Sequence, residues 1–194
     1  KFLDEHHHGW ILSAWQIIVE RYPKLCEEIE VGTWPTAFNG LYGTRNFVMN
    51  DKHGKCVAYA NSIWVFMDTE RKRPAKPSKE DIEKYETEPE LQMEYAPRKI
   101  VLPETWEEKE PFSVQKSDID TNGHVNNSRY VQMALEVADE NMAVVQIRVE
   151  YKKSALYGDK IFPKMHSEER KVTVKLCDAE DKTFAVVELT GEEK

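Results

Sequence analysis

The sequence DIDTNGHVNNSRY at residues 118–130 concentrates carboxylate, amide and imidazole side chains in one short segment. Asp120, Asn122 and His124 stand at alternate positions in front of a predicted helix. Such a set can orient an imidazole, activate a water molecule and offer backbone N–H donors to an oxyanion. Acyl hydrolysis needs groups of these kinds, so this segment is the candidate active site.

The start of the same segment also matches D-x-D-x-N-G, the opening of a calcium-binding EF-hand loop. Counted from Asp118, position 12 is Arg129, where an EF-hand has a bidentate glutamate. The preceding residues, PFSVQK, favour a strand where an EF-hand has a helix. The sequence therefore predicts no metal site here, and it indicates no cofactor.

A structural interpretation explains part of the segment equally well. Asn127 or Ser128 would cap the following helix by accepting a hydrogen bond from its free N–H groups. Capping accounts for the asparagines nearest the helix, but it gives no reason for His124 and Asp120.

The second half of the chain supplies the elements that must position this loop. Its pattern predicts a strand at 112–117, the loop, a helix at 128–140, and four strands at 142–153, 159–166, 169–177 and 183–190. The first half predicts four strands, at 10–20, 27–34, 44–50 and 55–68, in an antiparallel meander. Residues 69–110, dense in charge and proline, are interpreted as a linker with one short helix.

The two halves resemble each other in sequence. QIIVERY at 16–22 matches QIRVEY at 146–151, and the turn DKHGK at 51–55 matches DAEDK at 178–182. We interpret this as a diverged duplication in which the first half lacks the strand and helix that precede the four strands of the second. One helix wrapped by a curved antiparallel sheet, used twice, is an α+β fold.

Composition limits the partners. A chain of 194 residues with 40% hydrophobic content can bury one full core or two small ones. The formal net charge of −8 argues against nucleic acid, and stretches such as WILSAWQIIVE are too short to span a membrane.

The three cysteines, Cys26, Cys56 and Cys177, form no C-x-x-C motif and are expected in the core of a protein from a reducing compartment. The N-terminus shows no secretory signal, although a presequence already removed stays an alternative. The consecutive His6, His7 and His8 are interpreted as a loop or tag-like remnant, since zinc ligands are usually spaced.

The segment DIDTNGHVNNSRY, the following ALE and the later VEYKKSALYGD closely resemble acyl-carrier-protein thioesterases of the plant and bacterial type. WILSAWQIIVERYP, TWP, TRNF and SIWVFMDTERKRP resemble that family's N-terminal domain in the same order, so the resemblance covers nearly the whole chain. It implies a tandem (double) hotdog: an incomplete N-terminal hotdog at 1–68, a linker at 69–110, and a C-terminal hotdog with the catalytic loop at 111–194.

The resemblance also implies an activity, hydrolysis of the thioester between a fatty acyl chain and acyl carrier protein. It assigns catalytic roles to Asp120, Asn122 and His124. Plant members carry a Glu-Cys pair where this chain has Ser154 and Ala155, so we expect direct attack by water, with Ser154 helping to position it. Glu136 is a further candidate, because other hotdog hydrolases use a helix carboxylate; a structural ion pair or a surface charge is the alternative.

An acyl chain needs an apolar tunnel, for which Trp10, Trp15, Phe47, Trp64 and Phe66 are candidate lining residues, with an ordinary core as the alternative. Because carrier proteins are acidic, docking requires local positive charge. Such charge is present in the linker, with a solvated segment of no such role as the alternative: Arg71, Lys72, Arg73, Lys76 and Lys79.

Several alternatives stay open. The substrate could be acyl-CoA, or the protein could be a non-catalytic acyl-binding module. The implied location is the bacterial cytoplasm, or the plastid stroma after removal of a transit peptide, and a homodimer is compatible with the resemblance.

Overall fold

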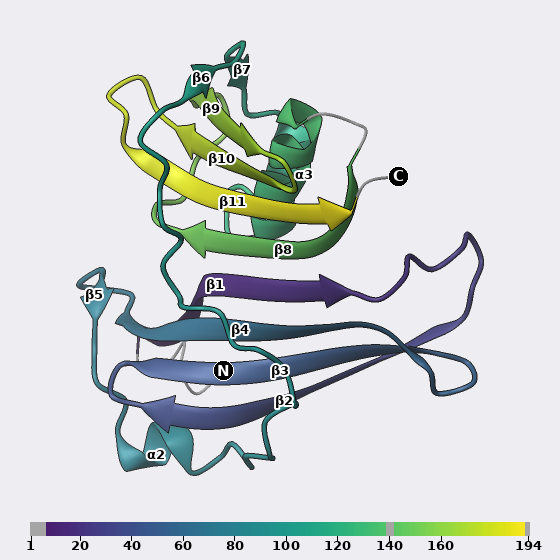
Figure 1. Cartoon of the computed structure of the whole chain (residues 1–194). Coiled ribbons are helices and arrows are strands. Elements are labelled where there is room, and N and C mark those ends of the chain that lie inside the picture. Colours follow the sequence, from purple (N-terminus) through teal and green to yellow (C-terminus); the bar gives the residue numbers. More distant parts are fainter. Residues whose placement is uncertain (1–6, 139–141, 193–194) are drawn as a thin grey trace. The chain divides into compact units, whose positions relative to one another are not determined.

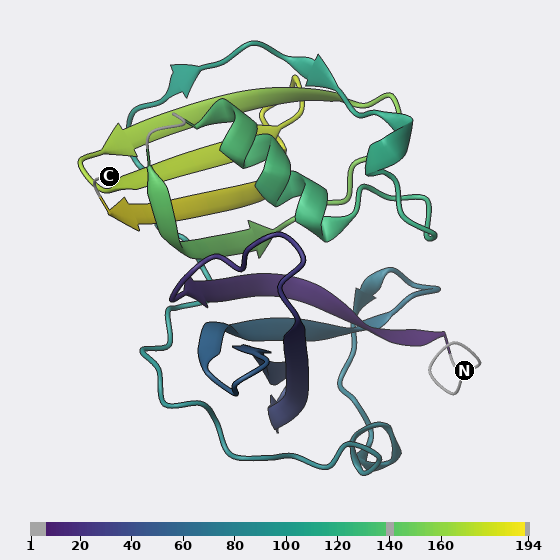
Figure 2. The same cartoon turned by 90° about the vertical axis from the view of Figure 1, so that its right-hand side faces the viewer.

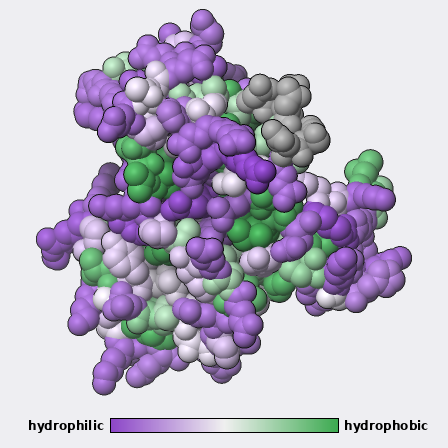
Figure 3. All heavy atoms as spheres, in the orientation of Figure 1, coloured by the Kyte–Doolittle hydropathy of each residue, from purple (hydrophilic) through white to green (hydrophobic). Residues whose placement is uncertain are grey.

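The computed structural model describes residues 7–138 and 142–192. The chain divides into two compact units, Lys1–Arg98 (unit 1) and Lys99–Lys194 (unit 2). Each unit is built on an antiparallel sheet with few helices (Figure 1). Hydrophilic side chains dominate the face of the molecule drawn in Figure 3, as the 32% content of charged residues requires.

Unit 1 contains the four long strands that alternation predicts. They are β1 (His8–Val19), β2 (Ile29–Asn39), β3 (Tyr42–Asp51) and β4 (Cys56–Asp68), with a short β5 (Arg73–Pro74) paired to β4. The prediction of a simple meander is wrong, because the order is β2-β3-β4-β1 and β1 pairs with β4.

Turn length explains this order. Tight turns at Gly40 and Gly54, both with positive φ (62° and 77°), join β2 to β3 and β3 to β4 as hairpins. The connection between β1 and β2 takes residues 20–28. Because this connection is long, β1 does not have to pair with β2, and it pairs with β4 on the side opposite β3.

The register places the five predicted aromatic side chains on one face of this sheet. Trp10 lies opposite Phe66, and a bulge between Leu12 and Ala14 shifts the alternation so that Trp15 joins the same face. The rings of Trp10 and Phe66 are 4.9 Å apart, and those of Trp15 and Phe47 are 4.6 Å apart. We call this the aromatic face.

The opposite face of the unit 1 sheet is covered by residues 86–98. The side chain of Gln16 donates to the Glu94 carbonyl (2.9 Å) and accepts from the Ala96 N–H (2.8 Å). The fully buried Asn46 accepts from the Leu91 N–H at 3.0 Å. Part of the segment predicted as a linker, residues 86–98, is therefore packed against the sheet, after a short capped helix, α2 (Lys79–Ile82).

Unit 2 has the same strand order. Its strands β8 (Ala143–Tyr151), β9 (Lys160–Glu168), β10 (Lys171–Cys177) and β11 (Thr183–Glu192) are ordered β8-β11-β10-β9, so that the first again pairs with the last. The short β6 (Glu107–Glu108) and β7 (Phe112–Ser113) pair with β9. The shared order agrees with the internal duplication seen in the sequence.

The helix α3 (Asn127–Val137) lies across one face of the unit 2 sheet (Figure 2) and contacts β9, β10 and β11. Tyr130, Met133 and Ala134 are its buried residues. The Tyr151 hydroxyl donates to the Asn127 carbonyl at 3.0 Å, which joins β8 to the first turn of the helix. The N-terminal end of α3, where the candidate loop enters, is thereby fixed to the sheet.

Candidate active site

The strand predicted at 112–117 is shorter in the structure, and this change shapes the candidate loop. β7 ends at Ser113, and a 3-10 turn, η1 (Lys116–Asp118), follows. The Asp118 carboxylate accepts from the Gln115 N–H at 2.7 Å, which closes the turn and takes the chain out of the extended conformation. The loop 119–126 then leads into α3.

Residues 120–124 form one tight turn. The Asp120 N–H donates to the His124 carbonyl at 2.8 Å, and the Gly123 N–H donates to the Asp120 carbonyl at 3.1 Å. Gly123 has φ +77°, a conformation that a side chain would strain. This turn brings Asp120, Asn122 and His124 together, with the side chains of Asn122 and His124 exposed.

The carboxylate of Asp120 holds the turn from within. It accepts from the backbone N–H of Asn122 (2.8 Å) and of His124 (3.3 Å). Burial alone would raise the pKa of Asp120, but these N–H donors outweigh it and keep the pKa below the ordinary value. The group is thus an ionised acceptor at neutral pH and is unsuited to act as an acid.

An ion pair that the sequence did not reveal anchors the start of the loop. The buried Asp118 carboxylate accepts from Arg129 Nε at 2.7 Å and Nη2 at 2.6 Å. In addition, the Asn126 N–H donates to the Asp118 carbonyl at 2.8 Å. Positions 1 and 12 of the apparent calcium loop are therefore joined to each other: both guanidinium nitrogens contact Oδ1 of Asp118, while its Oδ2 accepts from the Gln115 N–H.

Ser154 reaches the same region through its neighbour. The Val125 N–H donates to the Ala155 carbonyl at 2.9 Å, and the Ala155 N–H donates to the Tyr130 hydroxyl at 2.8 Å. Residues 152–159 thus run beside the loop that carries His124. Ser154 itself is exposed.

Tyr130→Phe tests this junction. Tyr130 is 2% exposed, and the change leaves the buried Ala155 N–H without an acceptor. We expect a loss of about 1–3 kcal/mol in the free energy of unfolding, measured by urea denaturation. Tyr157→Phe, which removes an exposed hydroxyl, is the matched control. Equal stability of the two variants would contradict the role of Tyr130.

The cap of α3 is shifted by one residue from the prediction. Asn126, and neither Asn127 nor Ser128, is the N-cap: its side-chain oxygen accepts from the Ser128 N–H at 3.0 Å, and its carbonyl accepts from the Arg129 N–H at 2.9 Å. Within the described residues, the Asn127 N–H makes no such bond. It is the first-turn donor that remains available to an anion.

Glu136 lies apart from the turn. It follows Asn126 by ten residues, which corresponds to about 15 Å along the helix axis. Its carboxylate accepts from Gln132 at 3.3 Å, and Gln132 in turn bonds Arg129. This ladder on the exposed side of α3 favours a structural role for Glu136.

The cysteines offer no nucleophile beside the turn. Cys177 is buried, and burial is the main cause that raises the pKa of its thiol to about 11. Cys56 is half-buried, with a pKa that burial also raises. The prediction that all three lie in the core is wrong for Cys26, which is exposed in the β1–β2 connection. Among the described residues, no cluster of three or more His, Cys, Asp and Glu side chains could hold a metal.

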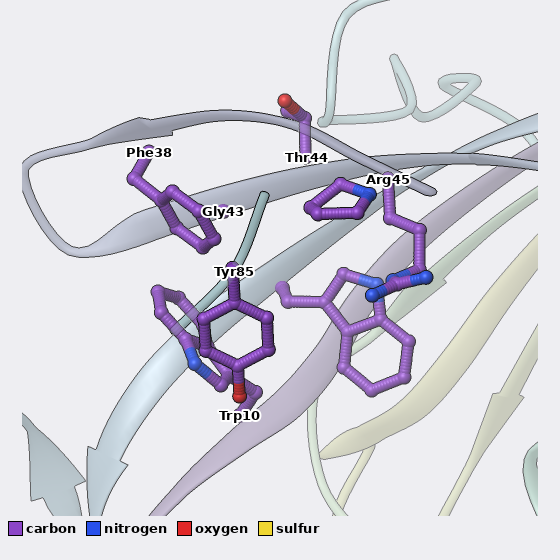
Figure 4. A pocket seen from close by; sticks show the side chains of 8 residues that line it. Trp10, Phe38, Gly43, Thr44, Arg45 and Tyr85 are labelled. Carbon is purple, nitrogen blue, oxygen red and sulfur yellow. The ribbon is translucent and has the colours of Figure 1, made fainter. Parts of the chain in front are cut away.

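The aromatic face of unit 1 contains two hollows. One, of about 150 Å³, lies among the rings of Trp10, Phe38, Trp64 and Tyr85, with the Arg45 side chain at its side (Figure 4). The other, of about 190 Å³, is lined almost wholly by apolar atoms and includes Trp15, Phe47 and Ile17. Four of the five predicted lining aromatics border a hollow, and Phe66 packs behind Trp10.

Curated relatives match much of the chain. The palmitoyl-acyl carrier protein thioesterase of Gossypium hirsutum is 31% identical over 138 residues, which cover 66% of this chain and 33% of that protein. The acyl-[acyl-carrier-protein] hydrolase FATB2 of Cuphea viscosissima is 30% identical over 159 residues, covering 74% and 38%. The chain spans about a third of the length of the curated relatives it matches.

Solved structures share the fold. An acyl-ACP thioesterase from Bacteroides thetaiotaomicron superposes with a TM-score of 0.87 at 24% identity, covering 98% of this chain and 79% of that one. The 12:0-ACP thioesterase from Umbellularia californica gives a TM-score of 0.83 at 18% identity, covering 100% and 78%.

Family models cover both units. Residues 1–85 match the acyl-ACP thioesterase N-terminal domain, and residues 103–190 match the acyl-ACP thioesterase C-terminal domain. Together the two matches account for most of the sequence, including every residue of the candidate site. The chain therefore belongs to the acyl-ACP thioesterase family.

Proposed function

We propose that this protein hydrolyses the thioester of fatty acyl-acyl carrier protein, releasing a free fatty acid and ending chain elongation. The observation that carries the proposal is the turn of residues 120–124, which exposes His124 beside a carboxylate and an amide at the entrance to α3. Membership of the family supplies the substrate class, and the turn supplies the groups that act on it.

In the proposed mechanism water is the nucleophile. The His124 imidazole takes a proton from the water molecule while the water oxygen forms a bond to the thioester carbonyl carbon. The C–S bond then breaks, and the pantetheine sulfur leaves with a proton from the imidazolium. General-base assistance of this kind contributes about 10²- to 10⁴-fold in rate.

The neighbouring groups divide the remaining work. Asn122, within the turn, and Ser154, in the neighbouring segment, are both exposed and are proposed to orient the water. Asp120 holds the turn through the N–H groups of Asn122 and His124. The Asn127 N–H is the proposed oxyanion donor, and a donor of that kind is worth about 10²- to 10³-fold.

The fold proposed for this function is a tandem hotdog. Gln16 aligns with Gln146 in the repeat, so Ile17 on the aromatic face corresponds to Ile147 on β8. Side chains alternate, so Ile147 points to the same side as Tyr151, which contacts α3. The aromatic face is thus the counterpart of the helix-covered face of unit 2, and we propose that it binds the acyl chain.

The remaining predictions form part of the same proposal. The domain limits 1–68, 69–110 and 111–194, the absence of the first strand and helix from the N-terminal hotdog, and a homodimer stay predictions. The curated relatives are named chloroplastic, so the proposed location is the plastid stroma or, for a bacterial protein, the cytoplasm. No helix in the described residues has the length and apolar character needed to span a membrane.

The test is a hydrolysis assay on thioesters of one acyl carrier protein, loaded with fatty acyl chains of graded length, with the matching acyl-CoA series in parallel. We expect release of fatty acid from the carrier series with the higher kcat/KM. A higher kcat/KM on the acyl-CoA series would show that acyl-CoA is the substrate. Binding of acyl chains with no hydrolysis of either series would show a binding module.

A further inference from the structure

Residues 152–160, KKSALYGDK, present two large apolar side chains to solvent beside the candidate site. Leu156 is 50% exposed and Tyr157 is 66% exposed. Both follow Ala155, whose carbonyl accepts from the Val125 N–H next to His124. We call residues 152–160 the LYG tip.

Hydrogen bonds within the LYG tip and to Val114 stabilise its turn. The Asp159 carboxylate accepts from the Leu156 N–H at 2.9 Å, and the Asp159 N–H donates to the Leu156 carbonyl at 3.1 Å. Gly158 has φ +84°, as the turn requires. The Val114 N–H also donates to the Asp159 carbonyl at 2.9 Å. Exposed apolar side chains on a fixed turn lose little entropy when they bind a partner.

Lysines outnumber acidic residues within the LYG tip itself, although the whole chain has a net charge of −8. Lys152, Lys153 and Lys160 belong to the tip, and Asp159 is its one acidic residue. Lys152 pairs with the buried Glu150 (2.6 Å) and Lys153 with Asp178 (3.4 Å), but about half of each lysine side chain stays exposed. These lysines offer N–H donors to an anionic partner.

We propose that the LYG tip docks the acidic carrier protein and delivers its pantetheine thioester to His124. The inference rests on the proposed function and adds the surface by which the partner is recognised. Apolar residues at the centre of an interface with charges at its rim are the usual arrangement of a specific contact. The cationic segment 71–79 differs, because TERKRPAKPSK around it has no large apolar residue.

Two variants test the tip: the double substitution Leu156→Ser with Tyr157→Ser, and Lys160→Glu. For each, kcat/KM is measured with one acyl chain on carrier protein and on CoA, and binding of fluorescently labelled holo-carrier is measured by anisotropy. We expect kcat/KM on the carrier substrate and carrier affinity to fall about tenfold or more, while hydrolysis of acyl-CoA changes less than about twofold.

The matched control is Lys171→Glu, because Lys171 follows the far end of β9 while Lys160 begins it, about 30 Å away. Equal losses on both substrates, or unchanged carrier binding in the tip variants, would overturn the proposal. The proposal would also be overturned if carrier binding were lost in the double variant Arg71→Glu with Lys72→Glu but kept in the tip variants. Absence of hydrolysis by the unaltered protein refutes the proposed function instead, and the binding arm still decides whether the tip docks the carrier.

Discussion

His124→Ala is expected to lower kcat on a fatty acyl-carrier protein thioester by about 10²- to 10⁴-fold, with KM nearly unchanged. The imidazole is the proposed base, and its loss leaves the attacking water without a proton acceptor. The turn itself should persist, because the hydrogen bonds of Asp120 to residue 124 go to its backbone N–H and carbonyl, which the substitution keeps.

The matched control for this variant is His53→Ala, which removes another exposed imidazole from the tight turn between β3 and β4. In hydrolysis assays kcat of His124→Ala should be lower than kcat of His53→Ala by about 10²- to 10⁴-fold. The circular dichroism spectra and unfolding midpoints of the two variants should agree. Hydrolysis that survives in His124→Ala would remove the base from the mechanism and favour the acyl-binding interpretation.

Local pattern predicted the strands of both units and the position of the loop, because alternation and turn chemistry act over a few residues. The predicted strands at 10–20, 44–50 and 55–68 correspond to β1, β3 and β4. The helix predicted at 128–140 corresponds to α3, which begins one residue earlier because Asn126 supplies the cap.

Pairings between distant residues were beyond the same reasoning. The sequence could not show that β1 passes its neighbour to reach β4, since the alternation in both strands is satisfied by either partner. The covering role of residues 86–98 was hidden for a similar reason. Its one signal was the placement of Gln16 and Asn46, polar residues inside strands, whose side chains hydrogen-bond that segment.

Arg129 has a structural role that the argument against calcium did not predict. Its position in the sequence predicted only that calcium would be repelled. In the structure its guanidinium contacts Asp118 through two nitrogens. Arg129 at position 12 therefore binds the carboxylate of Asp118 at position 1. In a calcium-binding loop the metal ion would bind that carboxylate.

Asp118→Ala is accordingly expected to destabilise the protein by about 3 kcal/mol, measured by urea unfolding. The Asp118 side chain is 4% exposed and that of Arg129 is 32% exposed, so solvent compensates in part for the unpaired guanidinium. The Gln115 N–H also loses its acceptor. Hydrolysis should fall as well, because the Asp118 side chain fixes the position of its own backbone carbonyl, which accepts from the N–H of the cap residue Asn126 at the entrance to α3.

Lys182→Ala provides the comparison, since it breaks an ion pair with Glu180 in which both side chains are more than half exposed, and it should cost less than about 1 kcal/mol. Asp118→Asn keeps an oxygen acceptor and should lie between the two. Addition of millimolar calcium should leave the unfolding midpoint of the unaltered protein unchanged, because Arg129 already neutralises the carboxylate. A rise in that midpoint with calcium, or a cost for Asp118→Ala as small as that for Lys182→Ala, would show that the ion pair does not hold the loop.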